Sequence, residues 1–575
     1  MRDANFFMHP NANWQRRYEA LRASFVERLS DAVVADRFGY NPGYIRLLKH
    51  QFRTGKFDFH EPPPDQQGKV ARRRVSQEIR NKIRSWREKR LSAGEITQLL
   101  SQENIEISVR TVERVLAEEG FEKLPRRTQL KIGITVAGAT VPDKSQIARL
   151  NTINGQRFES EAAGIFLFAP FIAQLGLNEV VHEAGLPGSK TIPALNYLLS
   201  FLAVKLLGTE RYAHVGDDHG FDSGLGVFAG LNVLPKCTAM STYSYSLDEV
   251  HIRRLQEAFV KQAEKLGLYG SPVVNMDFHT MPHFGDESVL EKHWAGARNK
   301  VLKGALTLVA QDAESKLWLY TTADIQRCEA DDQVLQFLDF WRKVRRGIEP
   351  TFVFDSRFIT YQKLSQLNSD GVKFITLRRR GEKLVRNIDM SACWRKIYIP
   401  HVKRKFPNPL IHESNVTLRG YQGEVRQLIV RGNGRENPAF LITNDFTSDI
   451  ESIVGNYARR WRVENGIAEA VKFFHLNSLS SPILTKIHFD VALTMIADTL
   501  YTMLAQKLRG FEDCDAPKIY RHFIRGKGIV SVKGSTVTVS FPRRAHNPIL
   551  RAVPWDKLPQ SLIAHNDTSV SLKFA

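Results

Sequence analysis

The order of apolar segments between residues 273 and 377 limits most strongly what this chain can fold into. Strands are predicted at 273–278, 301–310 and 316–322, a helix at 334–345, a strand at 351–355, a helix at 361–367 and a strand at 371–377. The strand segments are rich in β-forming side chains. This succession predicts an α/β fold with a mixed sheet flanked by helices, in which parallel connections cross over in the right-handed sense.

Two of the predicted strands end in a carboxylate. Asp277 closes the first apolar run and Asp355 closes a later one, while Glu464 lies in a segment of helical pattern at 457–464. Two aspartates at strand ends and a glutamate on a helix can hold a pair of hard divalent cations, because such ions prefer oxygen ligands. A cation pair of this kind activates water for phosphodiester cleavage. We therefore expect two Mg²⁺ ions here, with Mn²⁺ as the alternative metal.

The composition favours a polyanionic partner. The 575 residues carry a formal net charge of +20 and a pI of about 9.7, and each phosphate that a basic side chain neutralises releases counterions. The four cysteines form no Cys-x-x-Cys pair, which argues against a zinc site and fits a reducing cytoplasm. No secretory signal is visible, and residues 192–207 read as a buried helix more than as a membrane span. The expected location is cytoplasmic and nucleoid-associated, with no membrane partner.

The first sixty residues predict a helix-turn-helix. Helices are expected at 22–28 and 31–38, followed by a turn in which Asn41 caps a third helix at 42–53 and Pro42 takes its first position. This last helix is basic, as the second helix of a DNA-binding unit is. An ordinary helical hairpin is the alternative. The side chains expected to contact DNA are Arg46, Lys49 and Arg53.

A second helix-turn-helix is predicted beyond a proline-rich linker. Ser92 and Glu95 form a capping box, and Ser108 caps a further helix that Gly120 is expected to end. On that helix, Arg110 and Arg114 are the expected DNA contacts. The basic run at 72–74 fits either a phosphate contact or a solvated face.

Around the three carboxylates the chain resembles a known family. The matching stretches are 273–278, 352–358, and 441–445 leading into 457–464. They resemble bacterial insertion-sequence DDE transposases of the cut-and-paste type, over about residues 164–508. That resemblance implies a ribonuclease-H-like catalytic core interrupted by a β-rich insertion and preceded by all-α helix-turn-helix domains.

The family surrounds its catalytic glutamate with a Tyr-x2-Arg-x3-Glu-x6-Lys signature. Tyr457, Arg460 and Glu464 fit this spacing, whereas Lys472 stands one residue later than the family's lysine. On a helix the first three share one face, so Arg460 can meet a phosphate while Glu464 reaches the metals. The alternative is an exposed Arg–Glu pair four residues apart. We expect Tyr457, Arg460 and Lys472 to contact DNA.

The resemblance implies a DNA transposase that binds the terminal inverted repeats of its element. It would cleave and transfer strands of double-stranded DNA, at the element's ends and at a target, as a homodimer on paired ends. A DNA-binding regulator or inactivated derivative, and a structure-selective nuclease of the same fold, remain as alternatives. The expected divisions are a helix-turn-helix at 1–58, a linker at 59–75, a second helix-turn-helix at 76–135, a helical domain at 136–268, the core at 269–377 and 444–510, the insertion at 378–443, and a basic tail with a β-hairpin at 511–575.

Several other side chains compete for a role in the site. Asp286 is a rival to Asp277 as the first carboxylate, but it lies in a glycine-containing turn. His279 and His283 can assist proton transfer or be passive loop residues. Core packing is the expected role of Trp461, with base stacking as the alternative. The acidic and histidine residues at 214–219 are expected to form a polar loop, in preference to a metal cluster.

Overall fold

The chain divides into two compact units, residues 1–135 and 136–575. The computed structural model describes residues 13–55, 57, 75–88, 91–103, 105–119, 121, 145–219, 222–284, 290–295, 299–379, 381–388, 393–399, 408–434, 436–479, 481, 483–565 and 568–575.

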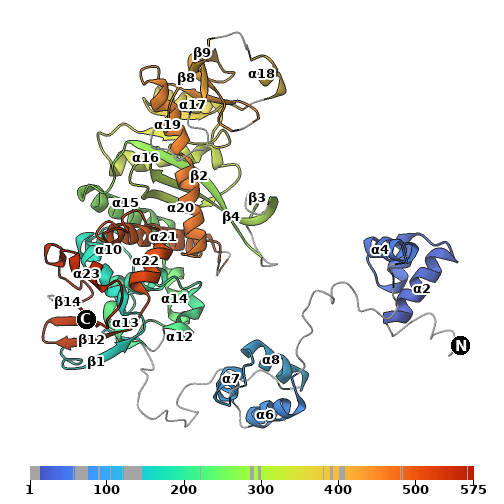
Figure 1. Ribbon diagram of the computed structural model, residues 1–575, viewed down its shortest axis with the longest axis vertical. Coiled ribbons are helices and arrows are strands. Elements are labelled where there is room, and N and C mark those ends of the chain that lie inside the picture. Colours follow the sequence, from blue (N-terminus) through green and yellow to red (C-terminus); the bar gives the residue numbers. More distant parts are fainter. Residues whose placement is uncertain are drawn as a thin grey trace. The chain divides into compact units, whose positions relative to one another are not determined.

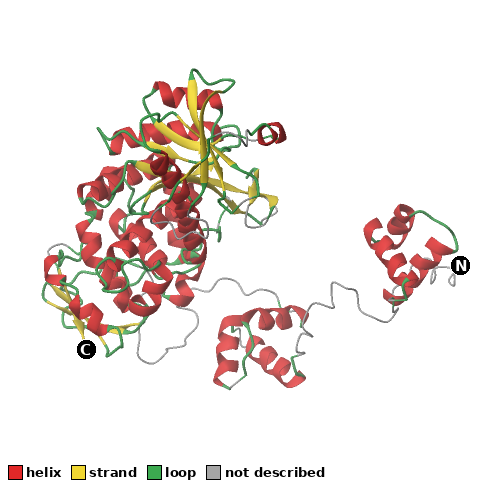
Figure 2. Cartoon of the chain, turned by 45° about the horizontal axis from the view of Figure 1, so that its top comes forward, coloured by secondary structure: helices red, strands yellow, loops and turns green. Residues whose placement is uncertain are grey.

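Within its described residues, the first unit is entirely helical and contains two clusters (Figures 1 and 2). The first cluster comprises α2 (Asn13–Phe25), α3 (Asp31–Phe38) and α4 (Pro42–Arg53). The predicted cap is confirmed, because the Asn41 side chain accepts a hydrogen bond from the amide of Gly43 at 2.8 Å. The first helix was predicted at 22–28 but runs from Asn13 to Phe25, and Arg28 has a left-handed φ of 57° that no helix continues through.

The second cluster comprises α6 (Gln77–Glu88), α7 (Ala93–Gln102) and α8 (Val109–Glu118). Both predicted caps are confirmed. Ser92 and Glu95 bond reciprocally as a capping box, and the Ser108 side chain accepts from the amide of Thr111. Such caps satisfy amides that a helix leaves unpaired at its start. The predicted helix stop at Gly120 lies outside the described residues.

The second unit is built on a ten-stranded mixed sheet, counted over its described residues. The strands and helices of the predicted core are β2 (Val273–Pro282), β3 (Lys292–Ala295), β4 (Lys300–Asp312), β5 (Trp318–Ile325), α16 (Gln333–Val344), β6 (Thr351–Val353), α17 (Tyr361–Ser369) and β7 (Lys373–Leu377). This confirms the predicted element order, with β3 as an addition. β2 lies at the centre: it pairs antiparallel with β4 and parallel with β6, and β6 pairs parallel with β7.

The predicted β-rich stretch after β7 extends this same sheet. Its elements are α18 (Glu382–Arg386), β8 (Arg395–Lys396), β9 (Leu410–Thr417), β10 (Glu424–Arg431) and β11 (Ala439–Thr443). β11 pairs antiparallel with β7, and β10, β9 and β8 follow in that order. The strands that carry the two aspartates and those of the β-rich stretch are therefore hydrogen-bonded into one sheet.

Two consecutive helices follow β11. They are α19 (Ile450–Arg459) and α20 (Trp461–Lys472). Asp449 takes the cap position of α19, where its side chain accepts from the amide of Ser452 at 2.7 Å. A carboxylate is a strong cap at a helix start, where the backbone amides carry partial positive charge.

Further helices pack around the sheet and bury a large apolar core. They are α9 (Ala169–Gln174), α10 (Leu177–Ala184), α11 (Ala194–Leu206), α12 (Val215–Asp218), α13 (Ser223–Phe228), α14 (Cys237–Tyr243), α15 (Glu249–Lys265), α21 (Leu484–Ala505), α22 (Ala516–Ile519) and α23 (Asn547–Ala552). The 214–219 segment is helical at α12, so the predicted loop there is wrong. α11 is buried from Asn196 to Leu206, as predicted.

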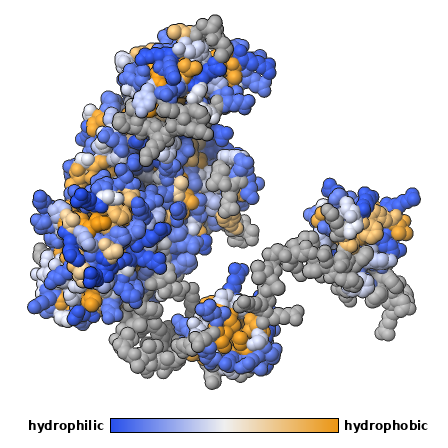
Figure 3. Space-filling view, in the orientation of Figure 1, coloured by the Kyte–Doolittle hydropathy of each residue, from blue (hydrophilic) through white to orange (hydrophobic). Residues whose placement is uncertain are grey.

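A small second sheet closes the unit. Its strands are β1 (Arg157–Ser160), β12 (Gly528–Lys533), β13 (Thr536–Phe541) and β14 (Ser569–Phe574). β12 and β13 confirm the predicted hairpin, whose turn uses Gly534 at a left-handed φ of 57°. On the face shown in Figure 3, the second unit is largely hydrophilic with scattered apolar side chains. Within the described residues, no single helix is long and apolar enough to cross a membrane; one bent helix pair, residues 163–174 and 177–184, has sufficient length and apolar composition together.

Candidate active site

Asp277 lies in the middle of β2, so the prediction that it closes its strand is wrong. β2 continues to Pro282 because β4 pairs with it as far as Gly304. The parallel pairing with β6, in contrast, stops at Asn275 and Val353. Asp277 therefore marks the place where β2 loses its parallel neighbour, two residues beyond the last pair.

Asp355 stands in the equivalent position on the neighbouring strand. It also lies two residues past the last pair, Asn275 with Val353. Side chains two residues apart on a strand point to the same face, and neighbouring strands lie about 5 Å apart. The register of β2 and β6 thus brings the two predicted carboxylates to one edge of the sheet.

Aromatic packing and backbone bonds fix both aspartates. The ring of Phe278, next to Asp277, stacks on Phe358 with centroids 3.9 Å apart. Asp277 accepts a hydrogen bond from the amide of Phe278 at 3.0 Å, and Asp355 accepts from the amide of Ser356 at 2.6 Å. Each carboxylate keeps oxygen lone pairs that these bonds do not use.

Glu464 approaches this edge from α20, which packs on β2 and β4. A glycine permits the close approach. A Cβ atom on Gly466 would lie 2.9 Å from the Nε2 atom of Gln311 in β4 and 3.2 Å from the Nε1 atom of Trp318 in β5. Both partners are buried, so a larger residue at 466 would push the helix away from the sheet and carry Glu464 with it.

Arg460 joins the helix to the strand. It stands at the junction of α19 and α20, and its Nη2 atom donates to Glu464 at 2.5 Å while Nη1 lies 3.6 Å from the Oδ2 atom of Asp277. Its guanidinium also lies over the ring of Tyr457, 5.9 Å from the centroid. Nη1 is buried and makes no hydrogen bond to any described residue. Nη1 can therefore donate a hydrogen bond to a phosphate oxygen.

Neighbouring charges and burial shift the pKa values of Asp277 and Arg460. Burial raises the pKa of Asp277 to about 6; the charges of Glu464 and Asp355 add to the rise, whereas Arg460 opposes it. Burial works against the charge of Arg460, but Asp277, Tyr457, Glu464 and Asp355 together raise its pKa. All three predicted carboxylates therefore lie near enough to this guanidinium for their charges to act on its pKa.

The three carboxylates suit hard divalent cations in donor type, since every ligand atom is an oxygen. Burial is the main cause of the raised pKa of Asp277, and the negative charges of Glu464 and Asp355 also disfavour its ionised form. A bound cation relieves such repulsion between carboxylates. In the described part of the chain, however, no three His, Cys, Asp or Glu residues are already gathered closely enough to hold a metal. Glu464 is turned toward Arg460, and a metal would require it to release that partner.

The other residues predicted for the core are Lys472, His279 and Trp461. Lys472 is exposed at the end of α20; burial raises the pKa of Glu469, and the charge of Lys472 offsets a small part of that rise. Burial lowers the pKa of His279, whose Nε2 atom bonds Asn477 at 2.7 Å, as a passive residue would. Trp461 is 40% exposed, so the expected core packing is wrong.

His283 and Asp286 are the other predicted candidates for this site. The Nε2 atom of His283 is buried and makes no hydrogen bond to a described residue. Asp286 lies outside the described residues.

The predicted DNA-binding residues of the first unit are only partly available. Arg46 and Arg110 are exposed on α4 and α8. Lys49 instead forms an ion pair with Asp31 at 2.7 Å, and Arg114 lies 3.5 Å from Glu118. Arg53 lies over the ring of Phe25, 5.3 Å from its centroid.

One cation at the carboxylate edge was not predicted. Arg379 follows β7, which runs parallel to β6, and its Nε atom donates to the backbone oxygen of Ser356 at 3.2 Å. The signal in the sequence is the basic run that directly follows this strand, at 378–380. Arg379 is exposed and can meet DNA beside Asp355.

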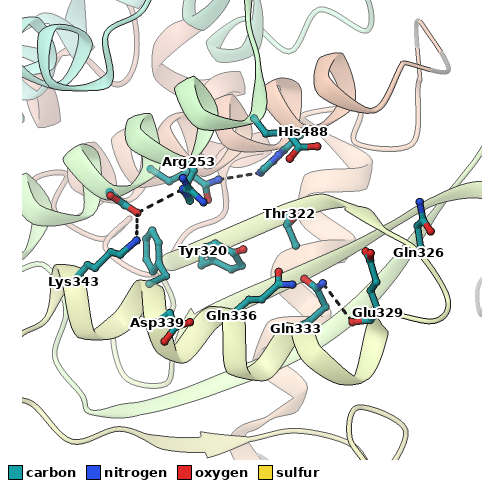
Figure 4. Close-up of a pocket in the computed structure, with 14 residues that line it drawn as sticks. Arg253, Tyr320, Thr322, Gln326, Glu329, Gln333, Gln336, Asp339, Lys343 and His488 are labelled. Atoms are coloured by element: carbon teal, nitrogen blue, oxygen red, sulfur yellow. Dashed lines mark hydrogen bonds and ion pairs between the residues drawn. The ribbon is translucent and has the colours of Figure 1, made fainter.

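A cavity of about 490 Å³ lies elsewhere, between α15, β5, α16 and α21 (Figure 4). Its lining mixes charges: Arg253 and Lys343 both approach Glu257, at 3.9 and 3.5 Å. None of Asp277, Asp355 and Glu464 lines it. It is therefore separate from the carboxylate site.

No protein-family model matches the sequence, and no curated protein matches it either. Among solved structures, the chain is similar to that of a piggyBac transposase in a synaptic complex with hairpin DNA, determined by cryo-electron microscopy. The two are 11% identical, and the match covers 64% of this chain and 82% of the other with a TM-score of 0.36. Because the similarity is this low, the assignment of function rests on the chain's own residues.

Proposed function

We propose that this protein is a DDE transposase that cleaves and joins DNA at the ends of a mobile element. The observation that carries the proposal is the register of β2 and β6, which sets Asp277 and Asp355 side by side, with Glu464 linked to the same place through Arg460. A ribonuclease-H-like core is supported by the sheet order: three antiparallel strands, β5, β4 and β2, continue into the parallel strands β6 and β7.

In this proposal Asp277, Asp355 and Glu464 hold two Mg²⁺ ions, with Mn²⁺ as a substitute. Bound cations supply the activation of water and the neutralisation of charge on the leaving oxygen. The protein's side chains bind and orient the DNA: Arg460 exchanges Glu464 for a phosphate oxygen, and Arg379 contacts the backbone nearby. Hydrolysis frees a 3′-hydroxyl group, which then attacks a second phosphodiester, so no covalent protein–DNA intermediate forms.

The helical clusters of the first unit have a separate task in this proposal. Their exposed arginines, Arg46 and Arg110, lie on the last helix of each cluster, where a helix-turn-helix presents its DNA-contacting side chains. They would hold the terminal inverted repeats while a homodimer pairs two ends. The net charge of +20 supports a DNA partner for the whole chain.

The test is a cleavage assay with the full chain, Mg²⁺ or Mn²⁺, and a supercoiled plasmid that carries the DNA flanking its gene. Converting Asp277, Asp355 or Glu464 to alanine should abolish nicking and strand transfer but preserve DNA binding. Glu451→Gln is the matched control, because this carboxylate lies on α19 and pairs with Arg395 away from the site. Wild-type cleavage in any of the three alanine variants would contradict the proposal.

A second candidate is an inactivated derivative that only binds DNA. It is favoured by the pairing of Glu464 with Arg460 and by the lack, among described residues, of a preassembled metal cluster. It predicts end binding with no metal-dependent nicking. A structure-selective nuclease would nick branched DNA without joining it to a target, so nicking and strand transfer measured together separate all three functions.

A further inference from the structure

The cavity between α15, β5, α16 and α21 has an acidic lining, although the whole chain carries a net charge of +20. Four carboxylates line it but only two cations; they are Glu249, Glu257, Glu329 and Asp339, and Arg253 and Lys343. A cleft lined by an excess of one charge concentrates the opposite charge inside it. A cavity of about 490 Å³ with this lining therefore favours a positively charged ligand.

The two cations are gathered around a single carboxylate. The Nζ atom of Lys343 lies 3.5 Å from the Oε1 atom of Glu257, and the Nε atom of Arg253 lies 3.9 Å from the same oxygen. The carboxylates of Glu329 and Asp339 are exposed and form no ion pair or hydrogen bond with any described residue. Figure 4 shows Lys343 at one end of the cavity and Glu329 at the other. Negative charge thus remains uncompensated along the α16 side.

A buried amide on the same side gives an independent indication of a ligand. Gln333, the first residue of α16, is 3% exposed, and its Oε1 atom is buried without a hydrogen bond to any described residue. Its Nε2 atom reaches only the backbone oxygen of Glu329, at 3.5 Å. The other buried glutamine of the lining, Gln256, accepts from the amide of Thr321 and donates to its backbone oxygen. Since buried acceptors are normally satisfied, Gln333 lacks a donor that a ligand can supply.

The spacing of these acceptors suits an elongated ligand better than a metal ion. Among the described residues, no three His, Cys, Asp or Glu side chains are gathered closely enough to hold a metal. Gln333 and Asp339 are six residues apart on α16, which is about 9 Å along the helix axis. The buried rings of Tyr320 and Phe340 also line the cavity. Aromatic rings accept both methylene groups and ammonium groups on their faces.

We propose that this cavity binds an aliphatic polyamine, a chain of methylene groups that carries two or more ammonium groups. One ammonium group donates to Gln333 and Glu329, and another lies at Asp339. The methylene groups between them pack against Tyr320 and Phe340. This site goes beyond the proposed function and needs no DNA, because none of the three carboxylates of the candidate active site lines the cavity.

The experiment is isothermal titration of the full chain with spermidine in the absence of nucleic acid. Wild-type protein should bind it saturably. Gln333→Leu removes the unpaired acceptor but keeps the bulk of the side chain, and it should weaken binding about tenfold, the scale of one charge-assisted hydrogen bond. Glu329→Gln with Asp339→Asn should weaken it by about tenfold or more and reduce its dependence on salt. n-Butylamine, with a single ammonium group, should bind more weakly than spermidine. Urea denaturation checks that each variant is folded.

The charge control is Glu349→Gln with Asp370→Asn, which removes two exposed carboxylates outside the lining. It should bind spermidine like wild type, and so should Asp277→Asn. No saturable binding by wild-type protein, or equal binding by the lining variants and the charge control, would overturn the proposal. Loss of binding in Asp277→Asn would place spermidine at the candidate active site and also overturn it. Displacement of spermidine by an equal concentration of Mg²⁺ would show a metal site instead. DNA cleavage is measured separately, so these failures would leave the proposed function standing.

Discussion

Asp277 and Asp445 belong to the same sheet region, but their pKa values are shifted in opposite directions. Asp445 follows β11, as Asp355 follows β6, and is 6% exposed. It accepts hydrogen bonds from the amides and hydroxyls of Thr447 and Ser448, and from Lys373 at 2.9 Å. Burial alone would raise the pKa of Asp445, but these donors hold it well below its usual range.

Asp277 has far fewer partners. It accepts one backbone hydrogen bond and faces Arg460 at 3.6 Å, and its pKa is raised to about 6, chiefly by burial. The difference distinguishes two uses of a buried acid. A buried carboxylate that accepts hydrogen bonds from many donors stabilises the fold. One with few donors destabilises the fold, and a ligand that binds to it removes that cost.

The largest effect expected from this comparison is on catalysis. Asp277→Asn should lower the rate of DNA cleavage roughly a thousandfold or more, the scale on which preorganised electrostatic groups act. Asp445→Asn should leave the rate per folded molecule unchanged, because the side chain of Asp445 accepts from Thr447, Ser448 and Lys373, none of which belongs to the carboxylate site. The measurement is plasmid nicking, normalised to the folded fraction by circular dichroism. Equal losses in both variants would remove the distinction.

The next effect is on stability at pH 7. Asp445→Asn should lower the free energy of unfolding by about 3 kcal/mol, because it leaves buried donors and the Lys373 charge without their acceptor. The depressed pKa gives the sign of the pH dependence: this stabilisation is present above about pH 4 and is lost as the pH falls through the folded pKa. Urea denaturation at pH 7 and pH 3 tests it. A loss of the same size at both pH values would contradict the hydrogen-bond account.

Asp277→Asn should have the opposite sign. An acid whose folded pKa is raised favours folding below its unfolded pKa near 4, and this contribution is lost as the pH rises through about 6. At pH 7 the amide should therefore increase the free energy of unfolding by up to about 3 kcal/mol, from about 1.4 kcal/mol per pKa unit. The gain should vanish below pH 4. A variant less stable than wild type at pH 7 would show that Asp277 is a structural residue like Asp445.

The smallest effect concerns Arg460. Because its charge lowers the pKa of Asp277, Arg460→Gln should move the pH midpoint of the Asp277 contribution upward and change stability by less than about 1 kcal/mol. Arg459→Gln is the matched control, since its guanidinium bonds Asn456 and not the carboxylates. The pH dependence of unfolding by urea measures the midpoint in each variant. An equal shift in both would mean that only the overall charge matters.

The sequence predicted the core elements well because each has a simple pattern. The apolar runs that end at Asp277 and Asp355 contain β2 residues and β6, respectively. Both aspartates lie two residues beyond the last parallel pair, Asn275 with Val353, so the register of the strands brings them together. The caps at Asn41, Ser92 and Ser108 depend on two or three adjacent residues, so local chemistry was sufficient.

What the sequence did not show depends on distant contacts. The role of Asp445 requires Lys373, which lies 72 residues away, and no local pattern joins them. β3 has only four residues, and it pairs with the first four residues of β4, which extend beyond the end of β2. The exposure of Trp461 likewise follows from the orientation of α20 on the sheet, because helical spacing alone cannot say which side faces the core.

The pairing of β7 with β11 has a consequence for any attempt to shorten the protein. If residues 378–443 formed a detachable module, a short linker could replace them and leave the catalytic strands intact. Removing them instead strips β7 of its partner along one side, and its free amides and carbonyls would invite other chains to add strands. We therefore expect such a deletion to aggregate before its chemistry can be assayed.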